Sequence, residues 1–334
     1  MTTRPVLVTG GTGFIGRAIV ERLLADGNRV KALARSEASG SELGGLGAEP
    51  VAGDLLDLEA LAAAMQGSDL VYHAAGANAF CLRDPAPMFE VNVRGSENVV
   101  RAAVRAGVRR VVYTSSAATL GEAGGTLGSE ESPHRGWFLS AYERSKFEAE
   151  QAVFGAARGT DIEVVSVNPA SVQGPGRATG STKLLLDYAN GRLKAVVDSR
   201  LSLVDIADCT EGHVLAASRG NPGERYVLSG ATLTVREGLA LVAAMLGVER
   251  PLRILPASFA LAAATAAEAI GWARRRNPRV CRELARTLIH GHAYDGSKAT
   301  RALDLRYTPI EETLRRTVAW WVEQGLVEGP RPAS

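Results

Sequence analysis

The feature that most constrains this 334-residue chain is a glycine-rich loop near its start. A short valine-rich run at residues 5–9 precedes the loop, and an amphipathic pattern begins directly after it. Glycines here allow a sharp turn, a close approach of the backbone to a pyrophosphate and tight packing of helix on strand. The N–H groups and the dipole at the helix start favour an anion. A dinucleotide site is therefore expected, with glycines that merely form a turn as the alternative. The expected contacts are Gly10, Thr12, Gly13, Phe14, Ile15 and Gly16.

Short β-branched runs alternate with helical patterns through the first half of the chain. Strands are expected at 5–9, 29–34, 49–52, 69–73, 109–114 and 162–167, and helices at 14–26, 58–65, 88–106 and 140–157. This alternation predicts an α/β fold, a Rossmann-type doubly wound parallel sheet with helices on both faces. Beyond Pro169 the alternation of strand and helix patterns becomes less regular. Helices expected at 235–246, 258–275 and 309–324 indicate a smaller, mainly helical C-terminal substrate lobe.

Composition excludes several classes of protein. Lysine plus arginine (38) and aspartate plus glutamate (36) leave a net charge of only +2, so no nucleic-acid partner is indicated. The start of the chain lacks the apolar run of a signal peptide. Cys81, Cys209 and Cys281 lie far apart without metal-ligand spacing, so neither a disulfide framework nor a metal site is expected. We therefore expect a globular, cytoplasmic protein of a reducing compartment.

The longest apolar stretch, residues 257–273, is followed by Arg274, Arg275 and Arg276. It is mostly alanine, contains Glu268 and falls short of the ~20 apolar residues of a membrane-spanning helix. We expect a helix that is buried or faces a second copy of the chain. The alternative is an interfacial helix with a basic end, which would make peripheral membrane contact without stable insertion.

The end of the second expected strand indicates which dinucleotide binds. An acidic residue there would accept hydrogen bonds from the adenosine ribose of NAD, but this chain has Arg35. An arginine can bond a 2′-phosphate and stack on adenine, so NADP(H) is expected ahead of NAD(H). A solvated surface arginine is the alternative. Further cofactor contacts are expected after the third and fourth strands, from Asp54, Leu55, His73, Ala74 and Ala75.

Three residues have the chemistry of carbonyl reduction. Tyr142 and Lys146 share one face of an expected helix, and Ser116 stands at the carboxyl end of a strand. Hydride transfer to a carbonyl carbon leaves an alkoxide that must be protonated. We expect the Lys146 ammonium to lower the pKa of the Tyr142 phenol, so that the phenol exchanges this proton, while Ser116 polarises the substrate oxygen. A chance Tyr-x-x-x-Lys on a surface helix is the alternative.

These motifs together resemble an extended short-chain dehydrogenase/reductase of the NAD-dependent epimerase/dehydratase superfamily. The segments that carry the resemblance are 9–16, 54–55, 73–76, 92–95, 113–116, 142–146, 168–175, 203–208 and 223–230. Arg35 and the run 113–117 are similar to the dihydroflavonol-4-reductase-like branch. Segments 179–198 and 203–230 are similar to bacterial proteins labelled hopanoid-associated sugar epimerases.

The resemblance implies further site residues and an organisation into two lobes. At the cofactor it implies Asn92, Asn168 and Pro169, together with Tyr142 and Lys146; near the substrate, position suggests Asn78, Ser171 and Val172. It implies an NADP-binding domain at 1–168, to which 200–230 returns, and a substrate-binding lobe at 169–199 and 231–330. It also implies a homodimer formed through the helices at 88–106 and 140–157.

Departures from the patterns of related subgroups narrow the reaction. Ala117 and Ala118 follow Ser116 where dehydratases carry an acid pair, which disfavours dehydration. Asn168 stands where sugar-nucleotide epimerases often carry arginine. Three arginines could serve an anion, although surface solvation is the simpler expectation for each: Arg177, Arg192 and Arg200.

We therefore expect an NADP(H)-dependent oxidoreductase that interconverts a carbonyl and a secondary alcohol on a small, fairly apolar substrate. The alternative is an NAD-dependent nucleotide-sugar epimerase, which would use Ser116, Tyr142 and Lys146 to oxidise and re-reduce one carbon. A third and less favoured hypothesis is a non-enzymatic dinucleotide sensor, which would not need the tyrosine and lysine.

Overall fold

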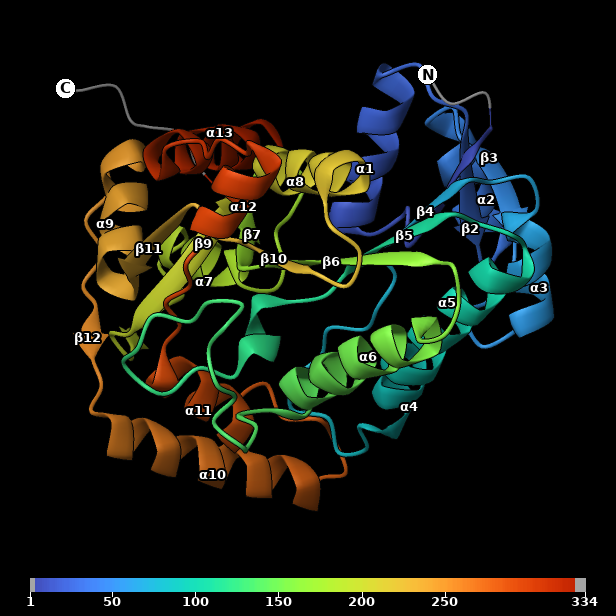
Figure 1. Cartoon of the computed structure of the whole chain (residues 1–334). Coiled ribbons are helices and arrows are strands. Elements are labelled where there is room, and N and C mark those ends of the chain that lie inside the picture. Colours follow the sequence, from blue (N-terminus) through green and yellow to red (C-terminus); the bar gives the residue numbers. More distant parts are fainter. Residues whose placement is uncertain (1–3, 328–334) are drawn as a thin grey trace.

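A seven-stranded parallel sheet forms the centre of the computed structural model, which describes residues 4–327 (Figure 1). Its order is β10-β6-β5-β4-β1-β2-β3. The strands are β1 (Val6–Thr9), β2 (Val30–Ala34), β3 (Glu49–Ala52), β4 (Leu70–His73), β5 (Arg110–Thr114), β6 (Glu163–Pro169) and β10 (Arg225–Leu228). The order reverses between β1 and β4, and the carboxyl ends of strands at such a switch point form a ligand-binding crevice. The expected α/β fold is confirmed.

Helices cover both faces of this sheet. On one face lie α1 (Phe14–Ala25), α8 (Ile206–Arg219) and α12 (Ser297–Leu303); on the other lie α3 (Leu58–Met65), α5 (Gly95–Arg105) and α6 (Ala141–Ala157). Side chains alternate along a strand, so Val6 and Val8 pack into the first layer and Leu7 into the second. Every residue of β1 is buried, as a strand covered on both faces requires.

The helix expected at 88–106 is interrupted. Helix α4 (Ala86–Phe89) continues into a π-helical segment at Glu90–Arg94 before α5 begins. Such segments widen the helix by one residue and often occur at functional sites. Asn92 lies within this segment and is buried. A further helix, α2 (Glu37–Gly45), links β2 to β3.

The second lobe contains two small sheets and a helical layer. Its strands are β7 (Ser171–Gln173), β8 (Ala195–Val196), β9 (Arg200–Asp205), β11 (Ala231–Thr234) and β12 (Arg253–Ile254), in the orders β11-β9-β7 and β12-β8. Its helices are α7 (Thr182–Ala189), α9 (Val235–Leu246), α10 (Ala257–Ala273), α11 (Arg282–His290) and α13 (Ile310–Glu323). Leu239, Leu314 and Trp321 lie in its core.

One boundary needs correction. Segment 203–208 was expected to return to the nucleotide domain, but β9 pairs with β7 and β11 in the smaller sheet. Only α8 and β10 rejoin the large sheet, through the pairing of β10 with β6. The last three residues of the expected substrate lobe, 328–330, lie outside the described residues.

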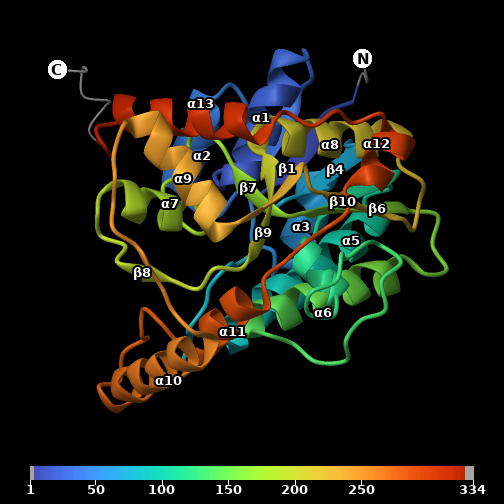
Figure 2. The same cartoon turned by 90° about the vertical axis from the view of Figure 1, so that its left-hand side faces the viewer.

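Helix α10 does not have the burial expected of it. Only Ala264 and Glu268 are buried, whereas Phe259 is 60% exposed and Ile270 53% exposed. The helix packs mainly on α11 and lies at the edge of the molecule (Figure 2). The expectation that this helix is buried within the chain is therefore wrong, whereas a face toward a second copy stays a prediction. No helix among residues 4–327 is long and apolar enough to cross a membrane.

The cysteine expectation is also wrong. Cys81 and Cys281 form a disulfide with a Cα–Cα distance of 5.5 Å, and Cys209 is free and buried. The two bonded residues are 200 positions apart in sequence, so their spacing could not indicate the contact that the fold creates. We expected a reducing compartment because no disulfide was expected among the cysteines. The disulfide removes this argument.

Candidate active site

The glycine loop between β1 and α1 has the shape of a phosphate cradle. Gly10 has a φ of +75°, and a Cβ atom there would lie 2.5 Å from the Ala75 nitrogen. A Cβ atom on Gly16 would lie 2.1 Å from the Gly10 oxygen, so any side chain at either position would push the loop open. Gly13 caps α1 without a side-chain hydrogen bond, and the first helical turn carries no acidic residue. The N-terminus of α1 is thus free to receive a pyrophosphate.

Two polar residues follow the neighbouring strands at the same sheet edge. Arg35 is exposed directly after β2, and no ion pair among residues 4–327 involves it. Asp54 is exposed after β3, and its Oδ1 accepts a hydrogen bond from the Leu56 nitrogen at 2.9 Å. Leu55 is buried, and its carbonyl accepts from Asn98 at 3.0 Å. These positions are compatible with adenosine contacts by Arg35 and Asp54, whereas the Leu55 side chain packs in the hydrophobic core.

His73 has both ring nitrogens engaged inside the protein. Its Nδ1 lies 2.7 Å from the Thr9 hydroxyl and its Nε2 lies 2.9 Å from the Ser96 hydroxyl. Complete burial lowers the pKa of His73 to about 3, so the ring is neutral. The side chain therefore joins β1, β4 and α5. The backbone of the segment from His73 to Ala75 is the part left to approach a cofactor.

The three expected catalytic residues meet at the carboxyl end of β5. Ser116 is half-buried there and caps the short 3₁₀ turn Ala117–Leu120. Tyr142 lies in the first turn of α6, with its ring 5.6 Å from that of Phe80. Lys146, one turn further on, is buried and donates to the Thr114 carbonyl at 2.9 Å. Serine, tyrosine and lysine are thus held on one β-strand end and one helix start.

Burial raises the pKa of Tyr142, while the Ser116 hydroxyl and the Arg177 guanidinium act to lower it. Burial dominates at the phenol, and the Lys146 ammonium donates to the Thr114 carbonyl of β5. The expected lowering of the Tyr142 pKa by Lys146 stays a prediction. Burial also lowers the pKa of Lys146, to about 8. Ser116 and Arg177 therefore both favour the phenolate form of Tyr142.

Arg177 is a site residue that sequence reasoning placed on the surface. It is half-buried, and its guanidinium lies 5.4 Å from the centre of the Phe14 ring. Arg177 thus stands between the glycine loop and Tyr142, where it can face an anion. Arg192, which pairs with Asp187 at 3.0 Å, and Arg200 are both exposed, in line with solvated surface positions.

Comparison with known proteins identifies the family. The sequence profile of the "NAD dependent epimerase/dehydratase family" matches residues 6–229. The chain belongs to this family. The expected resemblance to the extended short-chain dehydrogenases/reductases is confirmed, and a nicotinamide dinucleotide is the cofactor typical of the family.

Full-length relatives support the assignment. A protein of Synechocystis sp. named "Putative dihydroflavonol 4-reductase" is 33% identical over 330 residues, which is 96% of this chain and 95% of that protein. Sterol demethylase protein B of Methylococcus capsulatus is 32% identical over 338 residues, covering 98% and 100%. The crystal structure of gox2253 has a TM-score of 0.84 at 31% identity and covers 98% of this chain and 100% of that one. Other relatives, 31–34% identical, are named as a ketoreductase, a 2-alkyl-3-oxoalkanoate reductase and a 3 beta-hydroxysteroid dehydrogenase/Delta 5-->4-isomerase.

In this epimerase/dehydratase-family chain, two asparagines expected at the cofactor are tied to the protein itself. Asn92 binds both backbone groups of Ala77, at 2.7 and 2.9 Å, and donates to the Ser145 hydroxyl at 2.9 Å. Asn168 donates to the Ser116 carbonyl at 3.3 Å and to Glu150 at 2.6 Å. Both side chains therefore position the loops around the site. Pro169 is buried at the end of β6.

Glu150 is a supporting residue that sequence reasoning missed. Its side chain is fully buried, and it accepts hydrogen bonds from Asn168, from the Ser166 hydroxyl at 3.1 Å and from Arg225 at 3.2 Å. A signal was present, because Tyr142, Lys146 and Glu150 are spaced four residues apart and share one helix face.

The expected substrate residues lie in three different environments. Asn78 is exposed in the loop after β4, and the Ser171 hydroxyl donates to Ser181 at 2.7 Å. Val172 is 4% exposed and packs in the core with Val167, and its place in the pocket wall stays a prediction. Phe80, beside Tyr142, is the better candidate for an apolar wall.

Glu283 of α11 connects the second lobe to the site. One of its carboxylate oxygens accepts from the Cys81 nitrogen and the other from the Ala141 nitrogen at 2.9 Å. The loop that carries Phe80 and the start of α6 are therefore held by the same side chain. The Cys81–Cys281 disulfide lies at this junction.

A buried carboxylate also lies between two histidines in the second lobe. Glu122 Oε1 lies 2.7 Å from His292 Nδ1 and 3.4 Å from His290 Nε2. Their side-chain types could hold a metal ion, although no metal site was expected from the sequence. His290 and His292 are two residues apart, whereas Glu122 comes from a distant segment, so no sequence spacing signals its contact with them.

Proposed function

We propose that this chain is an NADP(H)-dependent oxidoreductase that interconverts a carbonyl and a secondary alcohol on a small, fairly apolar substrate. The observation that carries the proposal is the placement of Ser116, Tyr142 and Lys146 beside the glycine cradle. The dinucleotide supplies or accepts the hydride. All other steps are carried out by residues of the chain.

The proposed roles follow from chemistry and position. Ser116 donates a hydrogen bond to the substrate oxygen, and the Tyr142 hydroxyl gives that oxygen its proton as the carbonyl is reduced. The Lys146 ammonium supplies a positive charge near Ser116 and Tyr142, and it donates a hydrogen bond to the nicotinamide ribose. The Ser116 hydroxyl, which lowers the pKa of Tyr142, also favours release of the proton.

The preference for NADP(H) rests on Arg35. Its exposed guanidinium follows β2, where NAD-specific chains carry a carboxylate. A phosphate on the ribose would give it a charge-assisted partner. The apolar substrate is supported by Phe80 beside Tyr142 and by relatives named for sterol and ketone chemistry. A homodimer through α5 and α6 completes the proposal, with a small molecule rather than nucleic acid as substrate.

The test is direct. Purified protein mixed with NADPH and a panel of apolar ketones and aldehydes is expected to lose absorbance at the nicotinamide band. An Arg35→Ala variant is expected to raise the KM for NADPH by about tenfold and to leave the KM for NADH unchanged, because only NADPH carries the extra phosphate. Equal effects on both cofactors would contradict the NADP(H) preference.

A nucleotide-sugar epimerase is the second candidate, and Arg177 favours it. This arginine lies between Phe14 and Tyr142, where it could bind the diphosphate of a nucleotide sugar. An epimerase retains its cofactor through each cycle. Tightly bound NAD after purification, sugar epimerisation and no reduction of any ketone would replace the first proposal by this one.

A further inference from the structure

Helix α10 presents an apolar face to the outside of the molecule. Phe259 and Ile270 are close to three helical turns apart, so they lie on the same face. The opposite face carries the buried residues Ala264 and Glu268, and Glu268 bonds to Arg282 of α11 at 2.9 Å. The exposed residues on the outward face include the alanines Ala262, Ala263 and Ala266. The outward face between Phe259 and Ile270 is therefore largely apolar over about 16 Å.

The same helix ends in a cluster of positive charge. The exposed arginines that follow α10 are Arg274, Arg275, Arg276 and Arg279. Across residues 4–327, no ion pair involves any of the four. The single acidic residue of α10, Glu268, is buried and already bound. We call Phe259, the three outward alanines, Ile270 and these four arginines the docking face.

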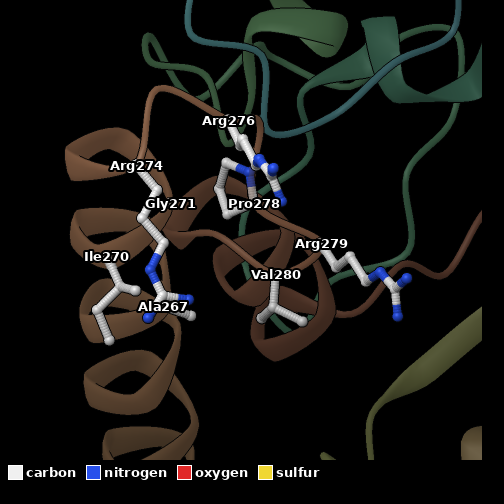
Figure 3. Close-up of a pocket in the computed structure, with 8 residues that line it drawn as sticks. All are labelled: Ala267, Ile270, Gly271, Arg274, Arg276, Pro278, Arg279 and Val280. Carbon is white, nitrogen blue, oxygen red and sulfur yellow. The ribbon is translucent and has the colours of Figure 1, made fainter.

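A hollow of about 500 Å³ opens at the basic end of the docking face. Arg274 reaches it from the helix, and Arg276 and Arg279 come from the segment that follows (Figure 3). Pro278 and Val280 add apolar walls. Guanidinium groups beside apolar surface suit a phosphate ester that is attached to a hydrocarbon, because arginine pairs with phosphate oxygens in two-bond geometry.

We infer that the docking face lays the protein on an anionic lipid surface. Helix α10 lies in the plane of the bilayer, with Phe259 and Ile270 at the boundary of the acyl chains and the arginines on headgroup phosphates. An apolar face combined with a basic end is typical of helices that lie in the interface rather than span it. Anionic lipid supplies the charge that complements the four arginines.

A second copy of the chain is a poorer occupant of this face. Two docking faces packed together would bring eight arginines into one interface, and the exposed side of α10 offers no acidic partner for them. Desolvating unpaired like charges is strongly unfavourable. Charge complementarity with the four arginines therefore favours an anionic lipid surface over a second copy of the chain.

The docking face is linked to the active site through the start of α11. Cys281 and Glu283, at the start of α11, hold Cys81 and Ala141 beside Tyr142. Docking would thus bring the loop that carries Phe80 close to the lipid, and an apolar substrate could enter from there. This consequence rests on the proposed function, whereas docking itself does not.

The experiment measures binding of the purified full chain to lipid vesicles by sedimentation, without any turnover. One set is pure phosphatidylcholine, and the other contains roughly one third phosphatidylglycerol. Binding is expected to the anionic set only and to weaken as salt is raised. Phe259→Ser with Ile270→Ser is expected to weaken binding at least about tenfold, since both side chains leave the apolar boundary. Changing Arg274, Arg275 and Arg276 to Gln is expected to weaken it about 100-fold.

A matched control removes three exposed arginines from the α12–α13 side of the molecule, by Arg301→Gln, Arg306→Gln and Arg315→Gln. This variant has the same net charge as the docking-face variant and is expected to keep binding. Unchanged thermal unfolding confirms that each variant is folded. No binding to anionic vesicles overturns the inference, as does equal loss in the control. A change in oligomeric mass on Phe259→Ser with Ile270→Ser, without an effect on vesicles, assigns the face to a second copy instead.

Discussion

Helices α6 and α10 are both 17 residues long, but they bury opposite kinds of side chain for their composition. Helix α6 is rich in charge, yet it buries Glu143, Lys146 and Glu150. Helix α10 has a single charged residue, yet it exposes Phe259 and Ile270. Each helix thus departs from the usual rule that apolar residues lie inside and charges outside. The two departures coincide with the two surfaces for which we propose contacts with other molecules, the active site and the docking face.

The buried charges of α6 are stable because each has a partner. Lys146 donates to Thr114, Glu150 accepts from Arg225 and Glu143 pairs with Arg135. Charges can be buried when they are paired and hydrogen-bonded, and removing one partner is then costly. On α10 no equivalent partner exists for the exposed apolar side chains within the described part of the chain. The buried charges of α6 therefore find all their partners within the chain, whereas the apolar face of α10 is not covered by any described part of it.

The largest expected effect tests whether the polar face of α6 is catalytic. Tyr142→Phe removes the hydroxyl that protonates the substrate oxygen, so turnover is expected to fall by 10³–10⁴-fold, at the upper end of general acid catalysis. NADPH binding, followed by fluorescence, is expected to persist because the glycine cradle is intact.

Tyr188→Phe is the matched control, because this tyrosine lies on α7 with only a 3.5 Å contact from its hydroxyl to the Arg250 carbonyl. Its turnover is expected to stay unchanged. Comparable turnover in the two variants would remove Tyr142 from the chemistry.

The next effect concerns stability. Glu150→Ala leaves Arg225, Asn168 and Ser166 without their shared buried acceptor, and the free energy of unfolding is expected to fall by about 3 kcal/mol. Chemical denaturation measures the change. Glu148→Ala, two residues earlier, removes only a surface pair with Arg144 and is expected to cost less than about 1 kcal/mol. Equal costs would show that the Glu150 network contributes no more to stability than a surface ion pair does.

Local patterns explain why the nucleotide half could be predicted and the rest of the site could not. The loop after β1, the strand alternation and the spacing of Tyr142 and Lys146 are all contained in short stretches of sequence. Arg177 and the disulfide depend on segments that the fold brings together from far apart. Periodicity shows that residues 257–273 form a helix, but only tertiary contacts decide whether its apolar face is covered.

The disulfide is the covalent link between the region of α6 and that of α10. Reduction is expected to lower the free energy of unfolding by about 2 kcal/mol or more, because the bond closes a loop of 200 residues. A variant that combines Cys81→Ser with Cys281→Ser is expected to show the same loss and no further response to reductant. A response to reductant that persists in the variant would point to a cause other than this bond.

A smaller effect follows from the pKa of Lys146, near 8. Above this pH the ammonium loses its proton, the positive charge behind Tyr142 disappears, and kcat/KM for reduction is expected to fall by about tenfold per pH unit. The pH profile measures this limb. In Lys146→Arg the charge persists at all accessible pH values, so the limb is expected to vanish even if the maximal rate is reduced. An unchanged limb in that variant would assign the titration to another group.

The smallest expected effect completes the comparison of the two helices. Ile270→Ser on α10 is expected to change the free energy of unfolding by less than about 0.5 kcal/mol, since the side chain is already 53% exposed. Val153→Ser on α6 replaces a fully buried side chain and is expected to cost more than about 2 kcal/mol. Both changes place serine in a 17-residue helix, so helix propensity contributes similarly to each. A large loss at Ile270 would mean that the apolar face of α10 is already covered in the folded protein, and a second copy of the chain would then be the natural cover.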